Sequence, residues 1–156
     1  MRMDKNILSE YADMKEEIKD LRRRIADDQK RIDQLKRTVV TDSVSCGKKG
    51  KKPIRIVKIK GFPQVEIERR VALMEKRQAK LQMLETDLIE KQMQAEEYIQ
   101  TIQKSELRIM FRLYYIDSLT WYQVALKMNQ MFPKRRVKYT EDNCKQRHKR
   151  YLEKVA

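Results

Sequence analysis

The sequence has 156 residues, of which 38% are charged, and it contains only three glycines and three prolines. So few chain-breaking residues in so polar a sequence predict long helices rather than a β-sandwich, a β-barrel or a glycine-rich nucleotide-binding fold. With 37 basic and 23 acidic residues the formal net charge is +14. This excess indicates an anionic partner, most often a nucleic acid, with an anionic membrane surface as the competing interpretation.

Neither a membrane span nor secretion is expected. No stretch approaches about 18 consecutive apolar residues, the length that crosses a bilayer. The first residues, MRMDKN, lack an apolar signal core. Cys46 and Cys144 lie far apart and form no CxxC pair, which is typical of a protein from the reducing cytoplasm.

The excess positive charge is concentrated in two short segments. Residues 38–63 contain seven basic and one acidic side chains, and residues 134–156 contain nine and three, so each segment contributes +6. Residues 64–103 contain six basic and eight acidic side chains and are slightly acidic. We therefore expect a polyanion to bind at the two basic segments.

Residues 1–37 are predicted to form an N-terminal coiled-coil helix. Apolar side chains recur with the alternating spacing of three and four residues that places them on one stripe of a helix. These residues are Ile7, Tyr11, Met14, Ile18, Leu21, Ile25, Ile32 and Leu35. Asp28 interrupts the stripe, and it either sets the register of a coiled coil or ends the good packing early.

Residues 38–63 form a basic linker or a β-arm. The string IRIVKIKGF alternates apolar and basic residues and has strand propensity. Disorder is an equally good interpretation of so charged and isolated a segment.

Residues 64–103 are predicted to form a long second coiled-coil helix. Six consecutive heptad positions are apolar, and they are Ile67, Met74, Leu81, Leu88, Ala95 and Ile102. Such a stripe needs a partner, which is either the first helix folded back antiparallel or a second chain. The predicted fold class is all-α, with a long helical hairpin as a stalk and a C-terminal three-helix module.

Residues 104–156 are predicted to form that module. Five of the seven tyrosines, the single tryptophan and the single histidine lie here. Thr120 begins a T-x-x-Q capping box, and Thr140 is placed to cap the last helix. Trp121 lies on an apolar stripe and is interpreted as a core anchor. A short helix, a turn and a basic helix together have the outline of a helix-turn-helix.

The last helix carries the candidate DNA-binding residues. Cys144, His148 and Tyr151 share its apolar face, while polar and basic residues occupy the opposite side. Asn and Gln side chains pair with adenine edges, whereas Lys and Arg contact guanine or phosphates. The predicted DNA-binding set, which includes the preceding basic run, is Arg135, Arg136, Thr140, Asn143, Lys145, Gln146, Lys149 and Arg150.

Two segments, LRIMFRLYYIDSLTWYQVALKMN and YTEDNCKQRHKRYLEK, look like the helix-turn-helix of sigma-factor region 4. They resemble more closely the phage and prophage late-gene regulators of the RinA/ArpU type. TDSVSCG and IRIVKIKGF are similar to a linker between two helices in related phage proteins. The resemblance implies a sequence-specific, DNA-binding transcription regulator, a sigma-like activator that acts with RNA polymerase in the bacterial host cytoplasm.

One segment departs from the family pattern. The stretch MFPKRRVKY, residues 131–139, lengthens the turn before the last helix. Its cations can add phosphate contacts, but the insertion can also tilt the helix away from the usual docking geometry.

No catalytic constellation is found, so we expect a protein that is not an enzyme and that uses no cofactor. Cys144 and His148 are four residues apart on one helix face, but no second pair of ligands lies nearby, so no metal site is predicted. The expected partners are double-stranded DNA, with RNA polymerase or a second protomer on the stalk. The alternatives are a phage small terminase subunit, in which the module order is commonly reversed, and a coiled-coil adaptor that binds acidic protein.

Overall fold

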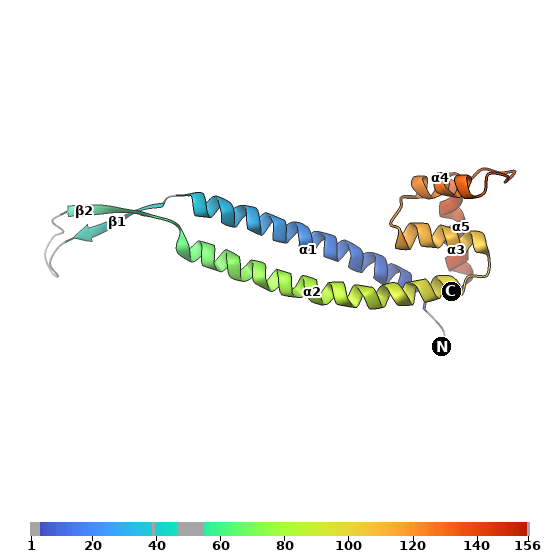
Figure 1. The fold of residues 1–156 in the computed structure, drawn as a ribbon, viewed down its shortest axis with the longest axis horizontal. Coiled ribbons are helices and arrows are strands. Elements are labelled where there is room, and N and C mark those ends of the chain that lie inside the picture. The colour runs from blue at the N-terminus through green and yellow to red at the C-terminus, as the bar shows by residue number, and fades with distance from the viewer. Residues whose placement is uncertain (1–3, 39, 47–54, 156) are drawn as a thin grey trace. The chain divides into compact units, whose positions relative to one another are not determined.

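The computed structural model describes residues 4–38, 40–46 and 55–155. They form two long helices, a two-stranded ribbon and a group of shorter C-terminal helices (Figure 1). The chain divides into two compact units, of which one combines residues 1–17 and 84–156 and the other contains residues 18–83. The predicted helical class, a helical hairpin followed by a C-terminal helical module, is confirmed. No helix among the described residues is long and apolar enough to cross a membrane.

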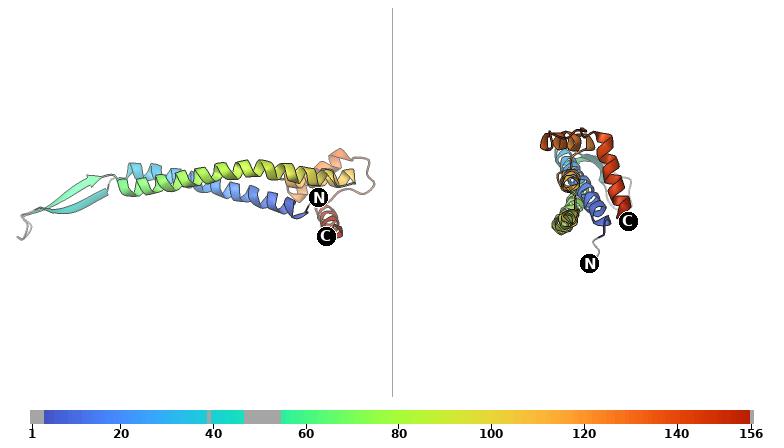
Figure 2. Two further views of the ribbon diagram at one scale, coloured as in Figure 1. Left: turned by 90° about the horizontal axis from the view of Figure 1, so that it is seen from below. Right: turned by 90° about the vertical axis from the view of Figure 1, so that its right-hand side faces the viewer.

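The unit of residues 18–83 contains parts of both long helices, α1 (Asn6–Arg37) and α2 (Gln64–Gln100). Within this unit the two helical segments run side by side in opposite directions, as Figure 1 and the left view of Figure 2 show. The predicted heptad positions form the buried seam. Its fully buried apolar members are Ile18, Leu21, Ile32, Leu35 and Ile67. The first helix therefore finds its partner within the same chain.

Asp28 lies in this seam and is only 4% exposed. Its carboxylate is 2.5 Å from the Nη1 atom of Arg77 on α2. Packing does not end at Asp28, since Ile32 and Leu35 beyond it are buried. An ion pair at one seam position penalises every register that separates the two charges. Of the two interpretations of Asp28, the structure therefore favours the setting of register.

The two long helices are joined by an antiparallel ribbon of β1 (Val40–Cys46) and β2 (Arg55–Gly61). Val40 pairs with Gly61 at one end of the ribbon, and Cys46 pairs with Arg55 at the other. Of the interpretations kept open for residues 38–63, the described part corresponds to the β-arm. The basic run at 47–54 lies outside the described residues.

The second unit contains the C-terminal helices. They are α3 (Ser105–Phe111), a π-helical turn η1 (Arg112–Ile116), α4 (Trp121–Met131) and α5 (Glu141–Lys154). The helix breaks after η1, where Ser118 adopts a left-handed backbone with φ of 56°. This backbone reverses the chain before α4.

The predicted capping box at the start of α4 is confirmed. The Oγ1 atom of Thr120 accepts a hydrogen bond from the backbone N–H of Gln123 at 3.3 Å. The Oε1 atom of Gln123 accepts one in return from the backbone N–H of Thr120 at 3.0 Å. The pair satisfies two backbone donors that the helix itself leaves without an acceptor.

The core of this unit is shared between the C-terminal helices and the adjoining ends of α1 and α2. One buried cluster consists of Leu8, Tyr11, Ala95, Tyr98, Ile99, Ile102, Phe111 and Tyr115. A second cluster consists of Met110, Leu113, Val124, Ala125, Met128, Tyr139 and Cys144. The globular unit expected at 104–156 therefore extends into both long helices, because their apolar stripes continue onto Phe111 and Tyr115.

The buried ion pair predicts an asymmetric response to mutation. Arg77→Met leaves the Asp28 carboxylate buried without its counter-charge, so we expect the free energy of unfolding to fall by about 3–5 kcal/mol. Asp28→Leu instead extends the apolar seam and leaves a partly exposed Arg77 that can reach water. We expect this second variant to be as stable as the parent or more stable. Urea unfolding of both variants measures the difference. Equal losses in the free energy of unfolding would contradict the interpretation of Asp28 and Arg77 as a buried ion pair.

Candidate nucleic-acid interface

The start of α5 is fixed by a second capping box, in which Asn143 is the reciprocal partner of Thr140. The backbone N–H of Asn143 donates to Thr140 Oγ1, and Asn143 Oδ1 accepts from the backbone N–H of Thr140, both at 3.2 Å. The Nδ2 atom of Asn143 also donates to the carbonyl of Lys138 at 3.0 Å. The side chains of Thr140 and Asn143 thus hold the helix start. The amide oxygen and nitrogen of Asn143 are already bonded within the chain, and its predicted pairing with a base stays a prediction.

The inner face of α5 packs on the module as its spacing predicted. Cys144 is completely buried, and its burial raises the pKa of the thiol, which keeps it protonated. The Nε2 atom of His148 and the hydroxyl of Tyr115 share a hydrogen bond of 2.6 Å. The imidazole also lies against Phe111 and Trp121, with ring centroids 5.1 and 4.9 Å apart. Burial lowers the pKa of His148 to about 4, so this side chain is a neutral part of the core.

The outer face of α5 contains both paired and unpaired side chains. The Nζ atom of Lys145 is 2.8 Å from Glu141, and that of Lys149 is 3.9 Å from Glu153. The Lys145–Glu141 hydrogen bond raises the pKa of the Lys145 ammonium group. These exposed pairs are each worth about 0–1 kcal/mol and are easily exchanged for contacts with a phosphate.

Gln146 and Arg150 form the middle of that outer face. Both are exposed, and they are one helical turn apart. Neither makes a hydrogen bond or an ion pair with the part of the chain that the structure describes. Their side chains are therefore available for a ligand without the loss of an internal contact.

The long loop between α4 and α5 is attached to the module at Tyr139, which is buried. The amide of Asn129 on α4 makes two hydrogen bonds with the backbone of this residue. Its Nδ2 donates to the Tyr139 carbonyl at 2.9 Å, and its Oδ1 accepts from the Tyr139 N–H at 2.8 Å. The loop therefore holds a defined position immediately before the N-cap of α5.

The side chain of Tyr139 is held by Glu106 on α3. The Tyr139 hydroxyl donates to the Glu106 carboxylate, and burial together with this hydrogen bond raises the pKa of Tyr139 to about 12. The guanidinium groups of Arg135 and Arg147 lie 3.3 and 3.8 Å from the same carboxylate. Arg135 also lies over the ring of Phe132 at 5.4 Å. Glu106 thus connects α3, the loop and α5.

Two of the residues that position α5, Asn129 and Glu106, were not among the predicted site residues. Asn129 is a polar residue near the end of an amphipathic helix, and Glu106 is an acidic residue in a first helical turn. Neither sequence pattern shows whether the side chain is exposed to solvent or makes a tertiary contact. Of the two predicted loop arginines, Arg135 is bound to Glu106, while Arg136 is exposed and contacts no acidic group among the described residues.

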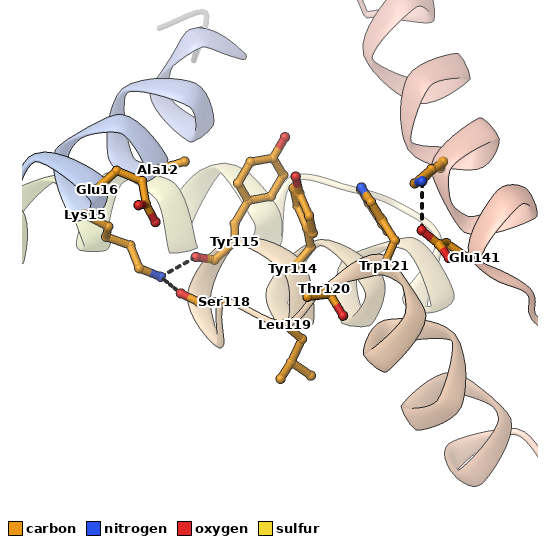
Figure 3. A pocket seen from close by; sticks show the side chains of 11 residues that line it. Ala12, Lys15, Glu16, Tyr114, Tyr115, Ser118, Leu119, Thr120, Trp121 and Glu141 are labelled. Atoms are coloured by element: carbon orange, nitrogen blue, oxygen red, sulfur yellow. Dashed lines mark hydrogen bonds and ion pairs between the residues drawn. The ribbon is translucent and has the colours of Figure 1, made fainter. Parts of the chain in front are cut away.

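A cleft of about 460 Å³ lies beside the start of α5 (Figure 3). Tyr114 and Trp121 line it and stack with ring centroids 4.0 Å apart. Trp121 is partly buried and packs against the second core cluster. At the other side, Lys15 Nζ donates to the carbonyl of Tyr115 at 2.8 Å and to the hydroxyl of Ser118. This lysine ties α1 to the end of η1.

In the described residues, no group of three or more His, Cys, Asp or Glu side chains is arranged to hold a metal ion. No family model matches this sequence, and no curated protein or solved structure matches it. The resemblance to the RinA/ArpU-type regulators accordingly stays a prediction from the sequence.

Removal of the Asn129 amide tests how the loop is held. Asn129→Ala leaves the N–H and carbonyl of the buried Tyr139 without partners, at about 1–3 kcal/mol for each unsatisfied group. We expect a clear loss of stability in urea unfolding of the full chain. Gln130→Ala, an exposed neighbour on the same helix, is the matched control and should change stability by less than about 0.5 kcal/mol. Equal losses of stability in the two variants would show that the hydrogen bonds between Asn129 and the Tyr139 backbone do not stabilise the fold.

The partly buried histidine predicts a pH dependence. His148 has a pKa of about 4 in the folded chain and about 6.5 when unfolded. The unfolded state therefore binds more protons between these values. The resulting stability is complete above about pH 6.5 and is lost as the pH falls towards about 4, with a slope of up to about 1.4 kcal/mol per pH unit.

This dependence is measurable because His148 is the single histidine of the chain. Urea unfolding as a function of pH should show a shallower slope for His148→Gln than for the parent. NMR titration of the folded parent should give a histidine pKa near 4. A histidine that titrates near about 6.5 in the folded chain would contradict its burial in the neutral form.

Proposed function

We propose that this protein is a sequence-specific DNA-binding transcription regulator and that α5 is its recognition helix. The observation that carries the proposal is the outer face of α5, where Gln146 and Arg150, which have no partner among the described residues, lie beside Lys145 and Lys149. Glutamine pairs with adenine and arginine with guanine in the major groove, which is wide enough for a helix.

Exposed cations on α5 and in the preceding loop support the same role. Lys145, Lys149 and Arg136 are exposed and would neutralise phosphates next to the groove, which supplies affinity without sequence preference. The two hydrogen bonds between Asn129 and the Tyr139 backbone support a fixed position of α5 for docking. In this proposal Thr140 and Asn143 support the helix start, and Arg135 braces the loop.

The resemblance to RinA/ArpU-type proteins supports a narrower proposal. The chain would be a phage or prophage sigma-like activator that acts with RNA polymerase in the cytoplasm of a bacterial host. One helix in one major groove contacts few base pairs. A second protomer or the polymerase, bound through the long helices, would supply the remaining specificity.

Two substitutions on α5 separate base reading from phosphate contact. Gln146→Ala should weaken binding to a duplex selected from a random pool by about 1–3 kcal/mol and change binding to scrambled duplex little. Lys149→Ala should weaken both by similar factors and reduce the slope of log affinity against log salt by about one. Anisotropy titrations of the full chain at several salt concentrations measure both effects.

The full chain is required because the core of the module includes residues of α1 and α2. The control is Gln130→Ala on α4, which is exposed and lies outside α5. It should bind both duplexes like the parent. Equal losses of Gln146→Ala on both duplexes would mean that α5 lies along the backbone, and sequence reading by this helix would be rejected.

A further inference from the structure

Arg147 on α5 lies outside the predicted DNA-binding set, and the structure holds its guanidinium group in a defined position. The guanidinium carbon lies 5.1 Å from the centre of the Tyr139 ring, and Nη1 lies 3.8 Å from the Glu106 carboxylate. The side chain is nevertheless 41% exposed. A long side chain that is already ordered loses little conformational entropy when its charged end binds a ligand.

The N–H donors of Arg147 are unused within the described part of the chain. A guanidinium group has five such donors, and the separation of 3.8 Å from Glu106 is too long for a hydrogen bond. Glu106 does not depend on this arginine, because it also accepts the Tyr139 hydroxyl and lies 3.3 Å from Arg135. Arg147 can therefore bind an anion while Glu106 continues to hold the loop.

The charges around Arg147 favour an anion in spite of Glu106. Tyr139 is neutral, since burial and its hydrogen bond raise its pKa to about 12. The guanidinium groups of Arg135 and Arg147 beside one carboxylate leave a net charge of +1. Residues 131–139 add three further cations and no acidic residue. All acidic residues of α5 are rotated by at least about 120° around the helix from Arg147, and they are Glu141, Asp142 and Glu153.

Arg147 lies on the opposite flank of α5 from the two lysines. Successive residues of an α-helix are rotated by about 100°, so Lys145 and Arg147 lie on opposite sides of Gln146. Lys149 is rotated by only about 40° from Lys145 and shares its flank. The outer face that contains Gln146 and Arg150 is therefore bordered by cations on both flanks.

We propose that Arg147 binds a phosphate of one DNA strand while Lys149, on the other flank of α5, binds a phosphate of the opposite strand. The inference rests on the proposed docking of α5 in DNA and adds a binding residue to it. The major groove is about 12 Å wide, and a helix with its side chains is about 10–12 Å across. A docked helix therefore has one phosphate backbone on each flank.

Contacts on both flanks would fix the rotation of α5 about its own axis. Phosphate contacts set the orientation of a protein on the duplex, and a guanidinium group can bind one phosphate through two parallel hydrogen bonds. With Arg147 on one strand and Lys149 on the other, Gln146 would face the base edges between them. Arg147 thus supplies orientation as well as charge.

The first test removes the charge of Arg147 in the full chain. For Arg147→Gln and a scrambled duplex, we expect about five- to tenfold weaker binding at about 0.1 M salt. The slope of log affinity against log salt should fall by about one. Arg147→Lys keeps the charge and should retain the slope of the parent. Fluorescence anisotropy titrations at several salt concentrations measure these effects.

The matched control is Arg112→Gln. It removes an exposed arginine that lies in η1, outside α5 and its loop, so it should bind both selected and scrambled duplexes like the parent. All these variants should retain the circular dichroism and melting temperature of the parent, because a partly exposed ion pair contributes only about 0–1 kcal/mol.

The second test locates the contacted phosphates. Uncharged methylphosphonate groups replace single phosphates, one at a time, along each strand of the selected duplex. Replacements that weaken binding of the parent chain mark its phosphate contacts. Arg147→Gln should become insensitive to replacements on one strand, and Lys149→Ala should become insensitive to replacements on the other strand.

Loss of sensitivity on opposite strands in the two variants supports the inference. An unchanged salt slope for Arg147→Gln, equal slope losses in Arg112→Gln, or loss on the same strand as Lys149→Ala overturns it. These results leave sequence reading by α5 intact when Gln146→Ala still distinguishes the selected duplex from the scrambled one. Equal weakening of binding to polyglutamate and to duplex, without a strand-specific change, also overturns the inference in favour of general charge attraction. A parent chain that binds no duplex rejects the proposed function and this inference with it.

Discussion

The contact on which the candidate interface most depends is the one that Asn129 and Glu106 make with Tyr139. The Asn129 amide satisfies both backbone groups of this buried residue, and the Glu106 carboxylate accepts its hydroxyl. Tyr139 directly precedes the N-cap Thr140, so the position of α5 follows from these bonds. From the sequence alone, the insertion at residues 131–139 could tilt the last helix. In the structure this insertion is attached to the module. The bonds at Tyr139 and the Arg135–Glu106 ion pair restrict the conformations of the loop.

A second constraint is the core that the C-terminal helices share with α1 and α2. Phe111 and Tyr115 are buried with Leu8 and Ile99, and Lys15 binds carbonyl groups at the end of η1. A small three-helix unit alone buries too little apolar surface for high stability. The adjoining turns of the long helices supply the missing surface. Any partner that loosens these turns would therefore also affect the helices that carry α5.

Local rules predicted much of this structure, and tertiary contacts account for the remainder. Heptads located both long helices, and the T-x-x-Q pattern correctly placed the start of α4 at Thr120. The capping role of Asn143 was not predicted, because asparagine suits both a base edge and a capping box and the sequence does not show the bonds that it makes with Lys138 and Thr140. The partners of Glu106 lie 29 to 41 positions away in sequence, a separation that periodicity does not address. The core that the C-terminal helices share with α1 and α2 was not predicted for the same reason.

The charges of α5 limit what this helix can do alone. Glu141 and Glu153 already pair with Lys145 and Lys149, so part of its positive charge is offset before any polyanion arrives. Most of the excess positive charge of residues 134–156 lies in the loop before α5, where acidic residues are absent. Phosphate attraction would thus be strongest at the loop, and the helix would contribute chiefly the shape and hydrogen bonds that distinguish one sequence from another. A module with this division would have modest affinity by itself, and most of its discrimination between sequences would come from α5.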